Sequence, residues 1–325
     1  MKVVSTSPSF AKYSNEPVKY LEKHGMQLVQ LPADIQEESF IAEIQDADAA
    51  IVAFNAITPN VLARTPNLKI ICKHGVGVDN IDLEAARKSQ VWVTNVPNTN
   101  KHAVADFTFA LMLSLARQIP AAVELTKKGE WPRIFGSDVY GKTVGIIGLG
   151  NIGKEVARRS RGFDMNILAF DPYPDHSFAE KHEVTFVSLE ELLSKSDFVT
   201  LHIALTEQTE NLIGRKELDM MKKSAYLINA SRGGIVSEDA LYEVLRDGSI
   251  AGAALDVFEQ EPVREHPLFG LPNCIATSHI AGYTSGAVNE IGMICVRNIV
   301  DVLVNKKKTR ACRKRNVAAA PDPET

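Results

Sequence analysis

Short apolar segments alternate with longer amphipathic segments along most of the chain. The short segments are rich in Val, Ile, Leu and Ala, which is typical of buried parallel strands. We predict strands at residues 1–5, 49–53, 68–72, 144–147, 167–170, 198–203, 225–229, 251–256 and 274–276. This alternation of strands and helices predicts an α/β fold built on doubly wound parallel sheets.

Three of the intervening segments predict helices with recognisable features. Residues 102–117 are mostly apolar and rich in Ala and Leu, so we expect a helix that is buried on several sides. Ser237 is a suitable N-cap for a helix that runs to Asp247 and ends at Gly248, where a left-handed residue is favoured. Residues 286–303 predict a last long helix.

A glycine-rich segment at residues 144–153, VGIIGLGNIG, is the most informative motif. The predicted strand leads into Gly-x-G-x-x-Gly and then into a helix, the arrangement that holds a dinucleotide pyrophosphate at a helix N-terminus. Gly148 can form the tight turn, Gly150 admits the pyrophosphate, and Gly153 allows the helix to pack against the strand. A glycine-rich turn in an unrelated α/β unit is the alternative.

Asp171 follows the next predicted strand and strengthens this interpretation. An acid at this position can accept hydrogen bonds from the adenosine ribose hydroxyls. It would repel a 2′-phosphate, and the following Pro172 and Tyr173 supply no cation. We therefore predict NAD rather than NADP as the cofactor.

Composition excludes several other classes of protein. The chain has 325 residues, of which 45% are hydrophobic and 23% charged, so one or two globular domains are expected. A net charge of -4 and the lack of a long apolar run favour neither nucleic acid nor membrane as a partner. The four cysteines have no metal-binding spacing, so we predict no metal site, reduced thiols and a cytoplasmic location.

Two polar segments after later strands carry residues suited to hydride-transfer chemistry. Arg232 follows a predicted strand and could grip a carboxylate with two parallel hydrogen bonds. His279 is the natural proton donor and acceptor near neutral pH. A carboxylate on its other ring nitrogen would orient the ring, and from the residues alone both Glu259 and Glu261 are candidates.

Four linked motifs make the chain resemble the D-isomer-specific 2-hydroxyacid dehydrogenase family. They are GLGNIG at 148–153, SRGG at 231–234, DVFEQEP at 256–262 and SHIAG at 278–282. The resemblance extends over residues 3–304. It implies a Rossmann-type dinucleotide domain (99–282) inserted in a flavodoxin-like substrate domain (1–98 and 283–305). The basic cluster and the Ala/Pro-rich composition of residues 306–325 predict a disordered tail.

The resemblance also implies roles for individual residues. Arg232 would bind the carboxylate and carbonyl of a 2-oxo acid, His279 would transfer the proton, and Glu261 would pair with His279. Asp256 would lie near the nicotinamide amide. The implied cofactor-binding residues are Gly148, Gly150, Asn151, Ile152, Gly153, Asp171, Pro172, His202, Ala230, Asp256 and Gly282. Similar enzymes are homodimers joined largely through the central domain.

Within the family, the loop that begins at Lys73 is similar to the substrate loop of D-3-phosphoglycerate dehydrogenases. The implied substrate-binding residues are Lys73, Val76, Gly77, Asn100, Arg133 and Arg232. Lys73 stands where an Arg is usual, which keeps the charge but loses the bidentate fork. Phosphoglycerate is thus one candidate substrate, and glyoxylate, hydroxypyruvate or another anionic 2-oxo acid is the alternative.

A second class of function is a non-catalytic corepressor that senses NAD(H). The basic cluster at residues 306–315 is compatible with such a role, although a solvated tail is the simpler interpretation. The joint presence of Arg232, Glu261 and His279 favours an enzyme.

Overall fold

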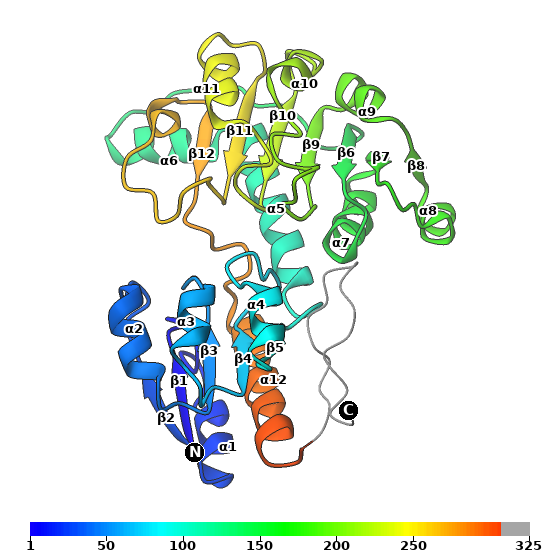
Figure 1. Cartoon of the computed structure of the whole chain (residues 1–325). Coiled ribbons are helices and arrows are strands. Elements are labelled where there is room, and N and C mark those ends of the chain that lie inside the picture. Colours follow the sequence, from blue (N-terminus) through cyan, green and yellow to red (C-terminus); the bar gives the residue numbers. More distant parts are fainter. Residues whose placement is uncertain (307–325) are drawn as a thin grey trace. The chain divides into compact units, whose positions relative to one another are not determined.

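A computed structural model describes residues 1–306, and these form two compact α/β units. The first unit comprises residues 1–100 together with the chain from 283 onward, and the second comprises residues 101–282. Figure 1 shows the elements of both units. The expected basic tail lies outside the described residues, except for Lys306.

The first unit contains a five-stranded parallel sheet with the order β2-β1-β3-β4-β5. Its strands are β1 (Lys2–Ser5), β2 (Gln27–Gln30), β3 (Ala49–Val52), β4 (Ile70–Lys73) and β5 (Trp92–Thr94). This 2-1-3-4-5 order is that of flavodoxin-like folds, as predicted.

Helices cover both faces of this sheet because adjacent strand residues point to opposite sides. Val3, Ala49 and Cys72 face one apolar cluster, while Val4, Ala50 and Ile71 face another. The first cluster includes α1 (Glu16–Lys23) and α12 (Ser285–Leu303), and the second includes α2 (Glu37–Ile44), α3 (Pro59–Ala63) and α4 (Leu83–Lys88).

The second unit contains a seven-stranded parallel sheet with the order β12-β11-β10-β9-β6-β7-β8. Its strands are β6 (Thr143–Ile147), β7 (Asn166–Phe170), β8 (Val184–Phe186), β9 (Phe198–Leu201), β10 (Tyr226–Asn229), β11 (Gly252–Leu255) and β12 (Cys274–Ala276). Counted from β6, this is the dinucleotide-binding order 3-2-1-4-5-6 with one further strand, so the predicted fold class is confirmed.

Two apolar clusters cover the faces of the larger sheet. One is formed with α5 (Lys101–Ala116), α7 (Asn151–Ser160) and α8 (His176–His182), and the other with α9 (Leu189–Lys195), α10 (Arg215–Asp219) and α11 (Glu238–Arg246). The remaining elements of this unit are α6 (Ile119–Lys127), η1 (Arg161–Phe163) and η2 (Pro267–Gly270). Helix α6 has no buried residue and lies on the surface.

The predicted elements agree with the observed ones to within a few residues. The strand expected at 68–72 is β4, shifted toward the C-terminus because its pairing with β3 continues to the pair Val52–Lys73. Lys73 is therefore the last residue of a strand. The strand expected at 198–203 ends at Leu201, where its pairing with β6 and β10 ends.

None of the helices within residues 1–306 combines the length and the apolar character needed to span a membrane.

Candidate functional site

The candidate residues of the second unit gather at the carboxyl-terminal edge of its sheet. Since all strand pairs are parallel, the loops that follow β6, β7, β9, β10, β11 and β12 leave from the same edge. Ligands of open α/β sheets bind at this edge. These loops begin with or contain Gly148, Asp171, His202, Arg232, Asp256 and His279.

The glycine loop between β6 and α7 has the close contacts that its sequence predicts. Gly148 has a φ of +93°, which favours glycine. A Cβ at Gly153 would lie 2.1 Å from the carbonyl oxygen of Gly148, so only glycine fits there. Gly150 precedes the first residue of α7 and would have open space around a Cβ. The N–H groups of the first turn are therefore placed to bind an anion.

Asp171 holds this loop from the end of β7. Its Oδ2 accepts a hydrogen bond from the Leu149 N–H at 2.8 Å, and its Oδ1 accepts one from the Tyr173 N–H at 2.8 Å. Each carboxylate oxygen has a second acceptor site. The side chain can therefore shape the glycine loop and still accept a hydrogen bond from a ribose hydroxyl.

His202 lies against the same loop at the end of β9. Its carbonyl oxygen would be 2.7 Å from a Cβ at Gly148, and its Nε2 is 3.0 Å from Thr200 Oγ1. Its Nδ1 is buried without a hydrogen-bond partner among the described residues. Burial lowers the pKa of His202 to about 3, so the ring is neutral at physiological pH.

A compact turn after β10 presents Arg232. The Asn229 Oδ1 accepts hydrogen bonds from the Ser231 N–H at 3.1 Å and the Ser231 hydroxyl at 2.7 Å. The Asn229 Nδ2 donates to the Arg232 carbonyl oxygen at 2.8 Å. Asn229 was missed by the sequence analysis, although an Asn at a strand end that bonds to the backbone two residues on is a known turn signal.

His279 and Glu261 form the central pair of the site. Nδ1 of His279 is 2.7 Å from Oε2 of Glu261. The other carboxylate oxygen, Oε1, accepts a hydrogen bond from the Phe258 N–H at 3.0 Å. Of the two acids that the sequence left open, Glu261 is thus the one that contacts the ring, while the Glu259 N–H donates to Glu238 at 2.7 Å.

The surroundings of Glu261 keep it ionised. Burial raises the pKa of its carboxyl group, but the hydrogen bond and charge of His279, the Phe258 N–H and the charge of Arg232 outweigh burial, so the pKa lies below its usual value. A carboxylate in this position fixes the orientation of the ring.

Asp256 holds the turn that carries His279. Its carboxylate is completely buried and accepts hydrogen bonds from the Thr277 hydroxyl at 2.6 Å and from the N–H groups of Ile280 at 2.9 Å and Ala281 at 2.8 Å. The side chain therefore holds the turn that carries His279, whose φ of +56° is unusual for a residue other than glycine. The carboxylate keeps a further acceptor site, so its expected place near a nicotinamide amide stays a prediction.

A close backbone contact joins the Arg232 turn to the loop that carries Glu261. A Cβ at Gly233 would lie 2.0 Å from the Phe258 carbonyl carbon and 2.4 Å from the Glu259 nitrogen. Only glycine allows this approach. The turn after β10 and the loop after β11 are therefore fixed to each other.

The other cofactor candidates of the second unit have less specific surroundings. Ala230 is buried in a small apolar cluster with Val104 and Ala281, and Ile152 packs against it. Asn151 and Pro172 are exposed, and Gly282 is the last residue of the unit.

Lys73, Val76, Gly77 and Asn100 belong to the first unit. Lys73 Nζ donates to Asn80 Oδ1 at 2.7 Å and to the Ala53 carbonyl oxygen, both of which are uncharged acceptors. The Val76 carbonyl oxygen accepts from Asn95 Nδ2 at 2.6 Å, which holds the loop that includes Gly77. Burial, followed by the charge of Lys73, lowers the pKa of the neighbouring His74 to about 4.

Arg133 is exposed and belongs to the segment that follows α6. It lines a surface hollow of about 510 Å³ together with Arg117, Ile119 and Phe135. None of the contacts that the described residues show joins it to Arg232, Glu261 or His279.

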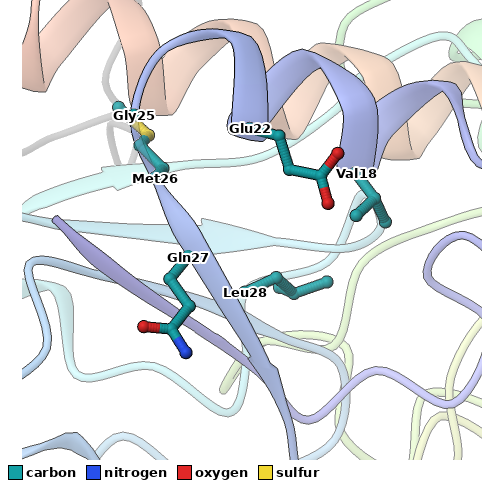
Figure 2. A pocket seen from close by; sticks show the side chains of 6 residues that line it. All are labelled: Val18, Glu22, Gly25, Met26, Gln27 and Leu28. Carbon is teal, nitrogen blue, oxygen red and sulfur yellow. The ribbon is translucent and has the colours of Figure 1, made fainter.

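A second hollow, of about 460 Å³, lies beside α1 and the start of β2 (Figure 2). Gln27 and Leu28 are the first two residues of β2, so this hollow is at the amino-terminal end of a strand. It contains none of the candidate residues. Within residues 1–306, no three His, Cys, Asp or Glu side chains are placed to hold a metal ion.

Comparisons with known proteins identify the family. Residues 109–281 match the family described as D-isomer specific 2-hydroxyacid dehydrogenase, NAD binding domain. The chain belongs to this family, and its second unit is an NAD(P)-binding domain.

The similar proteins differ in their substrates. The chain is 41% identical over 307 residues to a D-3-phosphoglycerate dehydrogenase of Methanocaldococcus jannaschii, covering 93% of this chain but 57% of that protein. It is 40% identical over 277 residues to a glyoxylate reductase of Thermococcus gammatolerans, covering 82% of this chain and 83% of that protein. A structure of D-lactate dehydrogenase from Escherichia coli is 30% identical, with a TM-score of 0.82 and coverage of 93% and 96%.

Two glycine substitutions are expected to separate dinucleotide binding from folding. Gly150→Ala has nothing within 4 Å of the new Cβ, so it should leave the Tm of the unliganded protein unchanged. It should weaken NADH binding at least about tenfold, equivalent to about 1.4 kcal/mol, because the methyl group occupies the approach of the pyrophosphate. Gly153→Ala should lower both Tm and affinity. An unchanged Kd for NADH in Gly150→Ala would contradict this assignment.

We expect His202 to lower the free energy of unfolding as the pH falls. Its pKa of about 3 lies below its ordinary value, so between about pH 6.5 and pH 3 the unfolded state binds more protons. Acidification through this range should lower the free energy of unfolding by up to about 1.4 kcal/mol per pH unit through this residue alone. His202→Gln, which keeps a partner for Thr200, should reduce that slope in chemical denaturation between pH 7 and pH 5. The exposed His176→Gln is the control, and an identical slope in wild type and His202→Gln would show the prediction to be wrong.

Proposed function

We propose that the protein is an NAD-dependent dehydrogenase that interconverts a D-2-hydroxy acid and its 2-oxo acid. The observation that carries this proposal is the 2.7 Å contact between His279 and Glu261, at the same sheet edge as Arg232 and the glycine loop. In this proposal the second unit binds the dinucleotide.

The residues divide the chemistry between them. His279 contacts Glu261 through Nδ1, and in this proposal its Nε2 accepts the proton of the substrate hydroxyl during oxidation and returns it during reduction. Arg232 binds the substrate carboxylate and stabilises negative charge on the reacting oxygen. The bound nicotinamide supplies the acceptor or donor of the hydride. Glu261 stabilises the imidazolium while the substrate is oxidised.

We propose NAD rather than NADP as the cofactor. Asp171 ends β7, where a ribose hydroxyl is bound in this type of fold, and its carboxylate would repel a 2′-phosphate. Pro172 and Tyr173 follow it and carry no positive charge.

For the substrate we propose 3-phosphoglycerate and its 2-oxo partner, 3-phosphohydroxypyruvate. The 41% identity to a D-3-phosphoglycerate dehydrogenase and the cation at Lys73 support this choice. The 40% identity to a glyoxylate reductase supports glyoxylate, hydroxypyruvate or another anionic 2-oxo acid as the alternative. A corepressor that only binds NAD(H) is less well supported, because Arg232, Glu261 and His279 are all present.

We also propose that the protein is a homodimer joined through its second unit. Exposed apolar side chains gather in and after α6, where Trp131 is 80% exposed and Phe135 is 87% exposed. Ile119 and Val123 of α6 are also exposed. Apolar surface of this kind is typical of a protein–protein interface.

A reducing compartment, such as the cytoplasm, is proposed for the protein. Cys72, Cys274 and Cys295 are free thiols. Burial raises the pKa of Cys274 to about 12, so it is not a reactive thiolate.

The test of the proposed function is oxidation of NADH and NADPH against a panel of 2-oxo acids. The panel contains 3-phosphohydroxypyruvate, hydroxypyruvate, glyoxylate and pyruvate. We expect the highest kcat/KM with NADH and 3-phosphohydroxypyruvate, and Lys73→Ala should raise KM for this phosphorylated substrate far more than for glyoxylate. The same two KM values are measured for Arg133→Ala, the second candidate cation. Equal effects on both substrates would exclude a second anion site, and no turnover of any 2-oxo acid would favour the corepressor.

Three substitutions test the catalytic residues. His279→Ala should reduce kcat by ~10²–10⁴-fold, the usual contribution of a general acid or base. Arg232→Lys should be severe because a point charge cannot replace the planar fork. Glu261→Gln should move the pH dependence of kcat/KM to lower pH, because the imidazolium loses a neighbouring carboxylate. Turnover close to that of wild type in His279→Ala would be incompatible with the mechanism.

A further inference from the structure

A second pair of a carboxylate and an imidazole, mostly shielded from solvent, contacts the candidate catalytic loop. Glu238 is in the first turn of α11, and its side chain is only 12% exposed. One of its oxygens, Oε1, accepts the Glu259 N–H at 2.7 Å, and the other, Oε2, is 3.0 Å from Nε2 of His266. The sequence analysis gave neither Glu238 nor His266 a role.

The contacts of His266 determine which of its nitrogens carries the proton. The Leu268 N–H donates to Nδ1 at 3.3 Å, so Nδ1 is an acceptor. In the neutral ring the hydrogen is then on Nε2, which donates it to Glu238. The ring also packs against Phe258 and Phe269, with centroid distances of 5.6 and 5.7 Å. The pair is thus a fixed unit that directs a carboxylate oxygen at the Glu259 N–H.

The peptide between Phe258 and Glu259 connects this pair to the candidate catalytic residues. The Phe258 N–H donates to Glu261, the Glu259 N–H donates to Glu238, and Gly233 packs against the carbonyl group between them. A shift of this peptide would change the position of Glu261 relative to His279. It would also disturb the contact with the turn that carries Arg232.

Glu238 is held in surroundings that disfavour its charged form, unlike the surface carboxylate Glu243 of the same helix. Burial, and then the charge of Glu259, raise the pKa of Glu238, although the Glu259 N–H and His266 oppose this. Glu243, on the same helix, is half-exposed and pairs with Arg215 on the surface at 3.0 Å. The partner of Glu238 is instead a backbone N–H of the catalytic loop.

We propose that Glu238 and His266 are positioning residues that hold the Phe258–Glu259 peptide and thereby fix Glu261 against His279. This inference rests on the proposed function, since it assigns Glu261 and His279 to proton transfer. Glu238 does not touch the substrate or the cofactor in this proposal. It acts on the reaction only through Glu261.

The first experiment compares Glu238→Ala with the control Glu243→Ala, which removes a surface carboxylate from the same helix. Glu238→Ala is expected to lower kcat by roughly 10- to 100-fold, the cost of a small misplacement of a catalytic group. Its Kd for NADH should stay within about twofold of wild type, because a substitution at Glu238 acts independently of the glycine loop, with which it shares no contact partner among the described residues. Glu243→Ala should behave as wild type in both measurements.

A double-mutant cycle with Glu261→Ala separates positioning from general destabilisation. If Glu238 acts through Glu261, adding Glu238→Ala to Glu261→Ala should reduce kcat by less than about twofold further. A full additive loss would overturn the proposal, as would a kcat of Glu238→Ala equal to that of wild type. If Glu261→Ala alone leaves kcat unchanged, the proposed function itself is wrong.

If Glu238→Ala does not fold, the variant His266→Asn and an NMR measurement test the same proposal. His266→Asn keeps an acceptor for the Leu268 N–H but removes the donor to Glu238, so it should lower kcat in the same direction and to a smaller extent. The NMR signal of the proton between His279 and Glu261 should also shift in His266→Asn. An unchanged signal together with an unchanged kcat would refute the positioning role without bearing on the chemistry of His279.

Discussion

The contact between Gly233 and the Phe258–Glu259 peptide is the constraint on which the candidate site depends. A Cβ at Gly233 would be 2.0 Å from the Phe258 carbonyl carbon, so the two loops meet backbone to backbone. Arg232 immediately precedes this contact, and Glu261 is bound to the Phe258 N–H on the other side of it. The separation between the Arg232 turn and the loop that carries Glu261 is therefore set by backbone packing, which varies less than the position of long side chains.

Four carboxylates at this sheet edge fix loops by accepting backbone N–H groups. Asp171 binds the glycine loop, Asp256 binds the turn of His279, Glu261 binds its own loop, and Glu238 binds the residue after Phe258. Hydrogen bonds to an ionised acceptor are stronger than those between neutral groups. The chain thus uses acids to make loops between strands rigid, and only Glu261 also contacts an imidazole that we assign to chemistry.

The sequence predicted the fold and the strand-end residues well because both follow from local patterns. Long apolar segments, the glycine motif and the acid after the next strand have physical signatures within a few residues of one another. The short edge strands β2, β5 and β8 were not predicted, because they have few buried residues and depend on pairing with a neighbour. The contact of Asp256 with the turn of His279, and the roles of Glu238 and His266, were missed, since their partners are more than twenty residues away and meet only after the loops have folded.

The division of the chain into two units explains why the reaction class is easier to derive than the substrate. The residues that we assign to the hydride and proton steps all belong to residues 101–282, where loops from one sheet edge fix one another. The substrate candidates Lys73, Val76 and Gly77 belong to the other unit and are held by a different set of contacts. Lys73 donates hydrogen bonds to the Ala53 carbonyl oxygen and to the Asn80 amide oxygen, and these contacts orient its ammonium group. Substitutions in that loop therefore leave the contacts among Arg232, Glu261 and His279 that the second unit provides unchanged.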